Sequence, residues 1–225
     1  MPKTRRYDDP CGTARALEVV GERWAVLVVR ELLFGPKRFG AIRAGLHGVS
    51  PNVLSQRLRE LESAGVVRRG TLSPPADVAV YELTERGRAL EPILLELGRW
   101  GSREPIDTNS DLGVDALMLA LKTLFAAEHA FDATFGITVD REDFRVAVHD
   151  RAIDVRRGAA TDARTHLTTD AKTLRAVAFG RESISHAEAA DRLIISGDRR
   201  PAQKFSRMFS APDGAMNKLT APRSR

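Results

Sequence analysis

The stretch VSPNVLSQRLRELESAG, residues 49–65, decides how the rest of the chain is interpreted. Ser50 is a good N-cap residue, and Pro51 suits the first helical position, where a missing N–H costs little. Three leucines recur at i, i+4 and i+7, which is the spacing of one buried stripe along a helix. Gly65 supplies a stop signal. The stretch is therefore predicted to be an amphipathic helix.

The outward face of this predicted helix carries Asn52, Ser55, Gln56 and Arg59. In the major groove of DNA, Arg pairs with guanine, and Asn or Gln pairs with adenine. We therefore interpret the stretch as the recognition helix of a winged helix-turn-helix. The alternative is an ordinary amphipathic surface helix, because such side chains are common on any solvated face.

Three shorter helices are predicted before this stretch. Residues 13–20 form the first, which ends at Gly21. Residues 24–35 form a second helix that is apolar over much of its circumference, so we expect it to be the central buried helix. Residues 39–46 form the third, which Gly48 closes. Two short helices in succession, the second with a polar face, match the layout of a helix-turn-helix motif.

Two β-prone runs follow, Val66–Arg69 and Val78–Leu83, and a polar, proline-containing loop joins them. They are predicted to form a hairpin with the shape of a wing. Arg68 and Arg69 would then lie where DNA phosphates pass. The alternative is a solvated charge pair on a surface hairpin.

A long helix is predicted next, from about Glu85 to Ser102, with Thr84 as its cap. Pro92 should bend it, because proline removes one backbone donor and crowds the preceding turn. A partner subunit could cover its apolar stripe, and palindromic DNA sites require such a two-fold dimer. The alternative is that a second domain covers it. The stripe consists of Leu90, Ile93, Leu94, Leu97 and Trp100.

Several motifs in order connect this first half to a known family: Cys11, ARALEVVGERW, RELLFGPKRFGAIR, VSPNVLSQRLRELESAGVVRR and YELTERGRAL. Together they resemble the HxlR family of bacterial winged-helix transcription regulators over residues 10–101. The resemblance implies a dimeric DNA-binding regulator that uses the N-terminal arm (Lys3, Arg5, Arg6) and the long helix as its dimer surface. The predicted DNA-binding residues are Ser50, Asn52, Ser55, Gln56, Arg59, Arg38, Arg68 and Arg69.

Cys11 is the one cysteine of the chain, so no intramolecular disulfide and no Cys-rich zinc site is expected. It lies where the resembled family commonly has a cysteine, which senses electrophiles or oxidants in some members. A helix start and the neighbouring Arg15 are both expected to lower the pKa of the thiol. The alternative is a small, half-buried core residue without chemistry.

Residues 103–111 are polar and contain a proline, so they are predicted to be a linker. We therefore expect a winged domain at residues 1–102, a second domain at residues 112–210 and a flexible tail at residues 211–225. The second domain is predicted to be α+β, with helices on one side of a mostly antiparallel sheet. Four alternating runs suit an antiparallel meander: Phe131–Val139, Asp143–Val148, Ala152–Arg156 and Thr165–Thr169.

Two motifs in this half, HLTTDAKTLRAVAFGRES and DRLIISGDRRPAQKFSRMF, are similar to the sterol carrier protein type 2 fold. The resemblance covers residues 112–210 and implies an apolar tunnel between sheet and helices that holds an apolar ligand. The alternative is that these side chains form a packed core, and that the domain serves as a dimerisation platform. The predicted ligand-binding residues are Leu121, Phe125, Phe135, Val146, Leu174, Phe179, Phe205 and Phe209.

The amino-acid sequence contains no recognisable catalytic or metal-binding motif. There is no nucleophile elbow, phosphate loop or dinucleotide fingerprint, and acidic residues at strand ends are interpreted as solvated turns. We expect no enzymatic activity, no cofactor and no metal. The histidines have no metal-ligand spacing on one helix: His47, His129, His149, His166 and His186.

Composition agrees with this interpretation. At 225 residues the chain has room for one large domain or two ordinary ones. A formal net charge of +5 favours an anionic partner such as DNA without requiring one. The start of the chain lacks an apolar signal core, and no run of about 18 apolar residues is present. We expect a cytoplasmic protein without a membrane association.

These observations favour a bacterial transcription regulator that binds a palindromic operator in double-stranded DNA as a homodimer. Its second domain is predicted to sense an apolar small molecule. Two alternatives stay open: a lipid or small-molecule carrier whose winged domain binds proteins, and a thiol-based redox sensor that acts through Cys11. A DNA reader should lose affinity steeply as salt rises, which separates it from the carrier.

Overall fold

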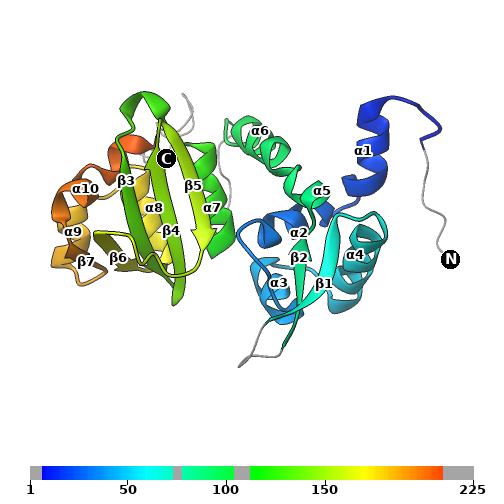
Figure 1. Ribbon diagram of the computed structural model, residues 1–225, viewed down its shortest axis with the longest axis horizontal. Helices are drawn as coiled ribbons and strands as arrows, with labels where there is room; N and C mark the ends of the chain where they lie inside the picture. Colours follow the sequence, from blue (N-terminus) through cyan, green and yellow to red (C-terminus); the bar gives the residue numbers. More distant parts are fainter. Residues whose placement is uncertain (1–6, 73–77, 104–111, 210–225) are drawn as a thin grey trace, which may run out of the picture. The chain divides into compact units, whose positions relative to one another are not determined.

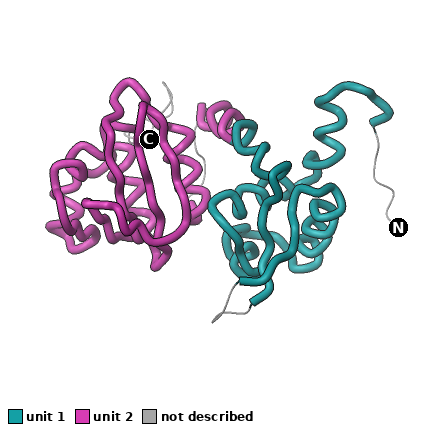
Figure 2. The backbone as a smooth tube through the Cα atoms, viewed as in Figure 1, with its two compact units in different colours: residues 1–94 teal, residues 95–225 magenta. Residues whose placement is uncertain are grey.

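The computed structural model describes residues 7–72, 78–103 and 112–209 (Figure 1). The chain divides into two compact units, residues 1–94 and 95–225 (Figure 2). This division falls earlier than the linker that the sequence predicts, most of which lies outside the described residues. The predicted flexible tail and the N-terminal arm lie outside them too.

Four helices open the first unit: α1 (Gly12–Val20), α2 (Ala25–Leu32), α3 (Phe39–Gly45) and α4 (Pro51–Ser63). Each lies within a few residues of its predicted place. Helix α2 is largely buried, as expected for the central helix, with Val28 and Val29 both at 0% exposure.

Helix α4 forms for the reasons that its sequence predicts. The Ser50 Oγ accepts a hydrogen bond from the backbone N–H of Val53 at 3.3 Å, so it satisfies a donor that the first helical turn leaves free. Leu54, Leu58 and Leu61 are buried, at 1% exposure or less. The leucine stripe therefore fixes which face of α4 points outward.

The wing consists of strands β1 (Val67–Leu72) and β2 (Val78–Leu83), which pair antiparallel. The tip of this hairpin lies outside the described residues. Strand β2 also pairs with the turn before α3: Lys37 and Tyr81 exchange two backbone hydrogen bonds, of 3.0 and 2.8 Å. This bridge anchors the wing to the helix-turn-helix.

The predicted long helix is wrong as a single element, because the structure has two helices, α5 (Glu85–Arg88) and α6 (Glu91–Gly101). Pro92 explains the break. It has no N–H to donate to the carbonyl of Arg88, and its ring would crowd that carbonyl. In the first turn of α6 the missing N–H costs nothing, so the helix restarts there.

The second unit is built on a five-stranded sheet in the order β5-β4-β3-β6-β7. Strand β4 shows why one face is buried, because Phe144, Val146 and Val148 alternate with more exposed residues. The strands are β3 (Ala133–Val139), β4 (Glu142–His149), β5 (Ala152–Arg157), β6 (Thr165–Thr169) and β7 (Leu193–Gly197).

The predicted meander is wrong at one place. Strand β6 does not follow β5 in the sheet but pairs with β3, in parallel. The other three pairings are antiparallel, so the prediction of a mostly antiparallel sheet is confirmed. The position of β6 makes β3 the central strand.

Helices cover the sheet on one face, as predicted. Figure 1 shows α7 (Val114–Thr123) and α8 (Ala171–Ala178) behind the strands, and α7 packs against both α8 and β5. The Asp170 side chain caps α8 by accepting the Thr173 N–H at 2.8 Å. The remaining short elements are η1 (Ala127–His129), α9 (Ile184–Ala189), α10 (Arg199–Gln203) and η2 (Phe205–Met208).

Candidate nucleic-acid interface and ligand core

Helix α4 carries its predicted base-reading residues on the face opposite the leucine stripe. Asn52 and Arg59 are exposed, and Ser55 and Gln56 are half-buried. At 100° per residue these four side chains fall within one sector of the helix. The Gln56 amide donates to the Glu60 carboxylate at 2.9 Å. Ser50 differs from them, because its hydroxyl oxygen already accepts a hydrogen bond as the helix cap.

The wing arginines lie on β1 and are exposed, at 63% for Arg68 and 61% for Arg69. Each has a carboxylate partner within the unit: Arg68 pairs with Glu82 at 2.9 Å, and Arg69 pairs with Glu62 at 3.4 Å. Exposed pairs of this kind contribute only about 0–1 kcal/mol, so exchanging the carboxylate for a DNA phosphate costs little.

Arg38, the remaining predicted DNA-binding residue, is exposed at the N-cap position of α3. It therefore lies on the helix before the recognition helix, as in the helix-turn-helix layout, where the first helix crosses the phosphate backbone.

A network of buried charges, which sequence reasoning missed, joins the elements that carry this surface. The Glu31 side chain is 1% exposed, and its carboxylate pairs with Arg30 at 2.7 Å and with Lys37 at 2.8 Å. The Arg30 guanidinium also donates to the carbonyl of Gly45, at the end of α3. The network joins α2 to the end of α3 and to Lys37 in the turn before α3. Lys37 also forms the bridge to strand β2 of the wing. The one sequence signal of this network is the charged pair Arg30-Glu31 inside an otherwise apolar helix.

A second missed residue is Arg57 on α4, whose side chain is only 11% exposed. It pairs with Glu60 on the same helix and with Glu22 before α2, at 3.8 Å from the latter. Arg57 therefore holds the recognition helix in place, and it differs in this from the outward-facing Arg59.

Cys11 is exposed at the N-cap position of α1, which excludes the alternative of a half-buried core residue. Hydrogen bonds from the backbone N–H groups of Ala14 and Thr13 lower the pKa of the thiol, as expected at a helix start. Arg15 was expected to contribute as well, but it is not among the causes of this lowering.

The five phenylalanines among the predicted ligand-binding residues come together in one aromatic cluster. The rings of Phe135 and Phe205 lie 5.2 Å apart, and those of Phe205 and Phe209 lie 5.0 Å apart. Phe209 also contacts Phe125 and Phe179, at 6.3 and 6.4 Å. These rings come from β3, from the C-terminal ends of α7 and α8 and from η2 with its neighbouring residues, so the sheet and the helices both contribute to the cluster. The apolar residues Leu121, Val146 and Leu174 are buried in the same unit, at 1% exposure or less.

In the described part of the second unit, three carboxyl groups have a lowered pKa. Hydrogen bonds from Arg145 lower the pKa of Asp162, and those from Arg192 lower the pKa of Glu182. Burial acts to raise the pKa of Asp170, but hydrogen bonds from the residues of the following turn outweigh it. All three serve ion pairs or a helix cap that hold the fold.

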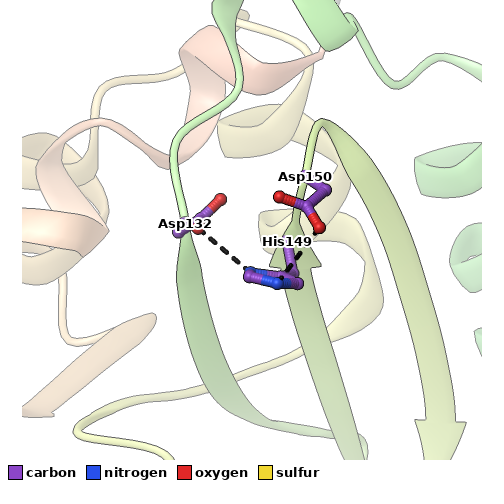
Figure 3. Close-up of side chains that lie close together, drawn as sticks. All are labelled: Asp132, His149 and Asp150. Carbon is purple, nitrogen blue, oxygen red and sulfur yellow. Dashed lines mark hydrogen bonds and ion pairs between the residues drawn. The ribbon is translucent and has the colours of Figure 1, made fainter.

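Among the residues that the structure describes, one cluster of potential metal ligands is present, formed by Asp132, His149 and Asp150 (Figure 3). The Nδ1 of His149 lies 3.0 Å from Asp132, and its Nε2 lies 3.2 Å from Asp150. The two carboxylates thus face different ring nitrogens, which point in different directions, and all three residues are exposed. One ring nitrogen and one oxygen of each carboxylate lie within 4.8 Å of one another, but exposed acidic groups are common without a bound ion, so this cluster is not by itself a metal site.

None of the helices within the described ranges combines the length and apolarity that a membrane span requires.

Comparison with known proteins assigns both halves of the chain. Residues 19–107 match the family model described as HxlR-like helix-turn-helix. Residues 122–210 match the SCP-2 sterol transfer family. Both resemblances seen in the sequence are thereby confirmed.

Three relatives are HTH-type transcriptional regulators. YvaP of Bacillus subtilis is 44% identical over 89 residues, which are 39% of this chain and 82% of YvaP. YodB, also of Bacillus subtilis, is 37% identical over 95 residues, 41% of this chain and 85% of YodB. A regulator from Mycobacterium tuberculosis is 44% identical over 87 residues, 39% of this chain and 54% of its own length. The chain therefore belongs to the HxlR-like helix-turn-helix family of transcriptional regulators and carries an SCP-2 sterol transfer domain in its second half.

Proposed function

We propose that this regulator binds a palindromic operator as a homodimer and that its second unit senses an apolar small molecule. The observation that carries the DNA-binding part is the outward face of α4 beside a wing with two exposed arginines. In this proposal Asn52, Gln56 and Arg59 contact base edges, and Arg68 and Arg69 contact phosphates. Phosphate contacts then position the protein, and base contacts give it specificity.

The homodimer is supported by an exposed apolar stripe on α6. Ile93, Leu97 and Trp100 follow the i, i+4, i+7 spacing of one helix face and are 51%, 48% and 72% exposed. Large apolar side chains gathered on one face mark interaction surfaces more often than chance. A second copy of the chain would cover this stripe and would place two recognition helices on the two half-sites of a palindrome.

The ligand-sensing part is supported by the match of the second unit to the SCP-2 sterol transfer family and by its aromatic cluster. A ligand that binds one geometry of the dimer more tightly shifts the spacing of the recognition helices and so changes operator affinity. The proposal assigns no catalytic role to the chain and places its action on DNA in the cytoplasm.

The test begins with selection of bound fragments from genomic DNA, followed by affinity measurements on the selected site at several salt concentrations. We expect the logarithm of the affinity to fall linearly with the logarithm of the salt concentration. Arg59→Ala should cost about 1–3 kcal/mol and relax the sequence preference. Arg68→Ala should weaken all sequences alike and reduce the salt slope by about one.

Arg181→Ala is the matched control, because it removes the same charge from an exposed site in the second unit. Unchanged DNA binding in both Arg59→Ala and Arg68→Ala would place the DNA-binding surface elsewhere. A protein that shows no salt-dependent DNA affinity would favour the carrier alternative, in which the winged unit binds another protein.

A further inference from the structure

A pocket of about 560 Å³ opens on the second unit, and it is distinct from the aromatic cluster predicted from sequence. Its lining includes His129 at the end of η1, Phe131 just before β3, and Lys204 and Arg207 on the chain that forms η2. Its volume lies within the range of small-molecule sites, which is about 300–1,000 Å³.

The two 3₁₀ turns that frame this pocket are joined directly. The backbone N–H of Ala126, just before η1, donates to the carbonyl of Met208 at 2.8 Å. Phe125 and Phe209 form a β-bridge beside this bond. The pocket walls therefore belong to the described fold of one unit, and their separation is fixed by backbone hydrogen bonds.

The rim of the pocket is cationic. Lys204 and Arg207 are exposed, and neither has a carboxylate partner among the described residues. Other arginines of the same unit do have one: Arg145 pairs with Asp162, and Arg199 pairs with Glu188, both at 2.6 Å. The positive charge at the pocket is thus available to an anion from outside the chain.

The lining of the pocket also includes an aromatic side chain. Phe131 is half-buried, and the Lys204 Nζ lies 5.8 Å from the centre of its ring. The Phe131 ring lies 6.5 Å from that of Phe135, which belongs to the aromatic cluster. An apolar group in this pocket can therefore contact Phe131, whose ring adjoins the aromatic cluster.

From this juxtaposition we propose that the pocket binds the anionic head group of an amphiphilic ligand. Lys204 and Arg207 hold a carboxylate or phosphate at the rim, and the apolar body of the ligand lies on Phe131. The proposal rests on the ligand-sensing role proposed for this unit and names the chemical class of its ligand.

The test is calorimetric titration of the full chain with decanoate, decyl phosphate and decanol, each kept below its aggregation concentration. The three probes share one apolar chain and differ in the head group. We expect both anions to bind at least about tenfold more tightly than decanol, since a charged hydrogen bond is worth about that factor. A tighter phosphate points to a phosphate-headed lipid as the source, and a tighter carboxylate points to a fatty acid.

The double variant Lys204→Gln/Arg207→Gln should lower the affinity for both anions to that for decanol and leave decanol unchanged. Phe131→Ala should weaken all three probes. Lys172→Gln/Arg181→Gln removes the same charge from exposed sites away from the pocket and should change nothing. Circular dichroism of each variant shows whether the fold is retained.

Either of two results would overturn the proposed head-group site. One is equal binding of decanol and the anions, which leaves apolar sensing standing without a cationic head-group site. The other is a preference for anions that persists in Lys204→Gln/Arg207→Gln. If no probe binds, the pocket and the ligand-sensing role both fail, whereas DNA binding is judged separately by operator affinity without ligand.

Discussion

At the scale of single residues, the Glu31 network leaves no room for a side chain at position 45, where the chain has Gly45. A Cβ added at Gly45 would lie 2.0 Å from the Glu31 Oε2, and that carboxylate is held by Lys37 and Arg30. Gly45→Ala would therefore displace a buried carboxylate from its cations. We expect a loss of about 1–3 kcal/mol in the free energy of unfolding, as for other overpacked sites. Urea unfolding of the full chain, followed by circular dichroism, measures it.

Gly40 supplies the matched control, because it lies on the same helix with nothing within 4 Å of an added Cβ. Gly40→Ala should stabilise the chain by about 0.5–1 kcal/mol, since alanine loses less backbone entropy in a helix than glycine. If both variants unfold alike, the buried network does not constrain the end of α3.

Cys11 leads to a prediction on pH. Because the backbone N–H groups of Ala14 and Thr13 lower the pKa of the thiol, its thiolate persists to lower pH than that of a free cysteine. The rate of alkylation by iodoacetamide should therefore reach half its maximum below about pH 8.5, the ordinary thiol pKa. The chain unfolded in urea should return to that value. A folded chain with the same midpoint as the unfolded one would refute the effect of the helix start.

Some side-chain positions could be predicted from the sequence, and others could not. The outward positions of Asn52 and Arg59 follow from the leucine spacing alone, because helical periodicity is a local property. Glu31, Lys37 and Arg57 carry no such signal. Their partners come from other elements, and only the folded chain brings those charges together.

At the scale of elements, α6 carries the clearest test of the dimer. Leu97 lies at the centre of the exposed apolar stripe, so Leu97→Glu would bury an unpaired charge in the proposed interface. We expect this to cost about 3 kcal/mol or more, which weakens the dimer at least about a hundredfold. Analytical ultracentrifugation measures the dissociation constant, and operator affinity should fall with it.

Arg99→Glu is the control on the same helix, because the Arg99 side chain is 44% exposed and, at 100° per residue, points about 120° away from the stripe. It should leave the dimer intact. A Leu97→Glu protein that still sediments as a dimer would show that another surface joins the two copies.

The elements were predictable to different degrees. The helices of the first unit were found because each has its own stripe and stop signal. The break between α5 and α6 was underestimated as a bend, because a cap at Thr84 followed by the apolar stripe of residues 90–100 suits one continuous helix, whereas Pro92 decides the backbone. The parallel pairing of β3 with β6 was missed, because alternation shows that a strand has one buried face but not which neighbour it joins.

At the scale of the whole molecule, the proposed coupling between ligand and operator must be reciprocal. If the ligand changes operator affinity by some factor, the operator changes ligand affinity by the same factor, typically about 5–150-fold. We expect a titration with decanoate to give different dissociation constants with and without saturating operator DNA. Equal dissociation constants would show that ligand binding in the second unit is not coupled to DNA binding in the first.

The position of β3 at the centre of its sheet also governs the order in which the chain folds during synthesis. The first unit lies within the first 94 residues, so it can fold as soon as these have emerged. The second unit must wait, because β3 gains its parallel neighbour β6 only after two hairpin strands have intervened, and β7 later still. Pairings between distant strands also form slowly. A nascent chain therefore completes its winged helix-turn-helix before the sheet of its second unit has closed, so the two halves reach their folded state at different times during synthesis.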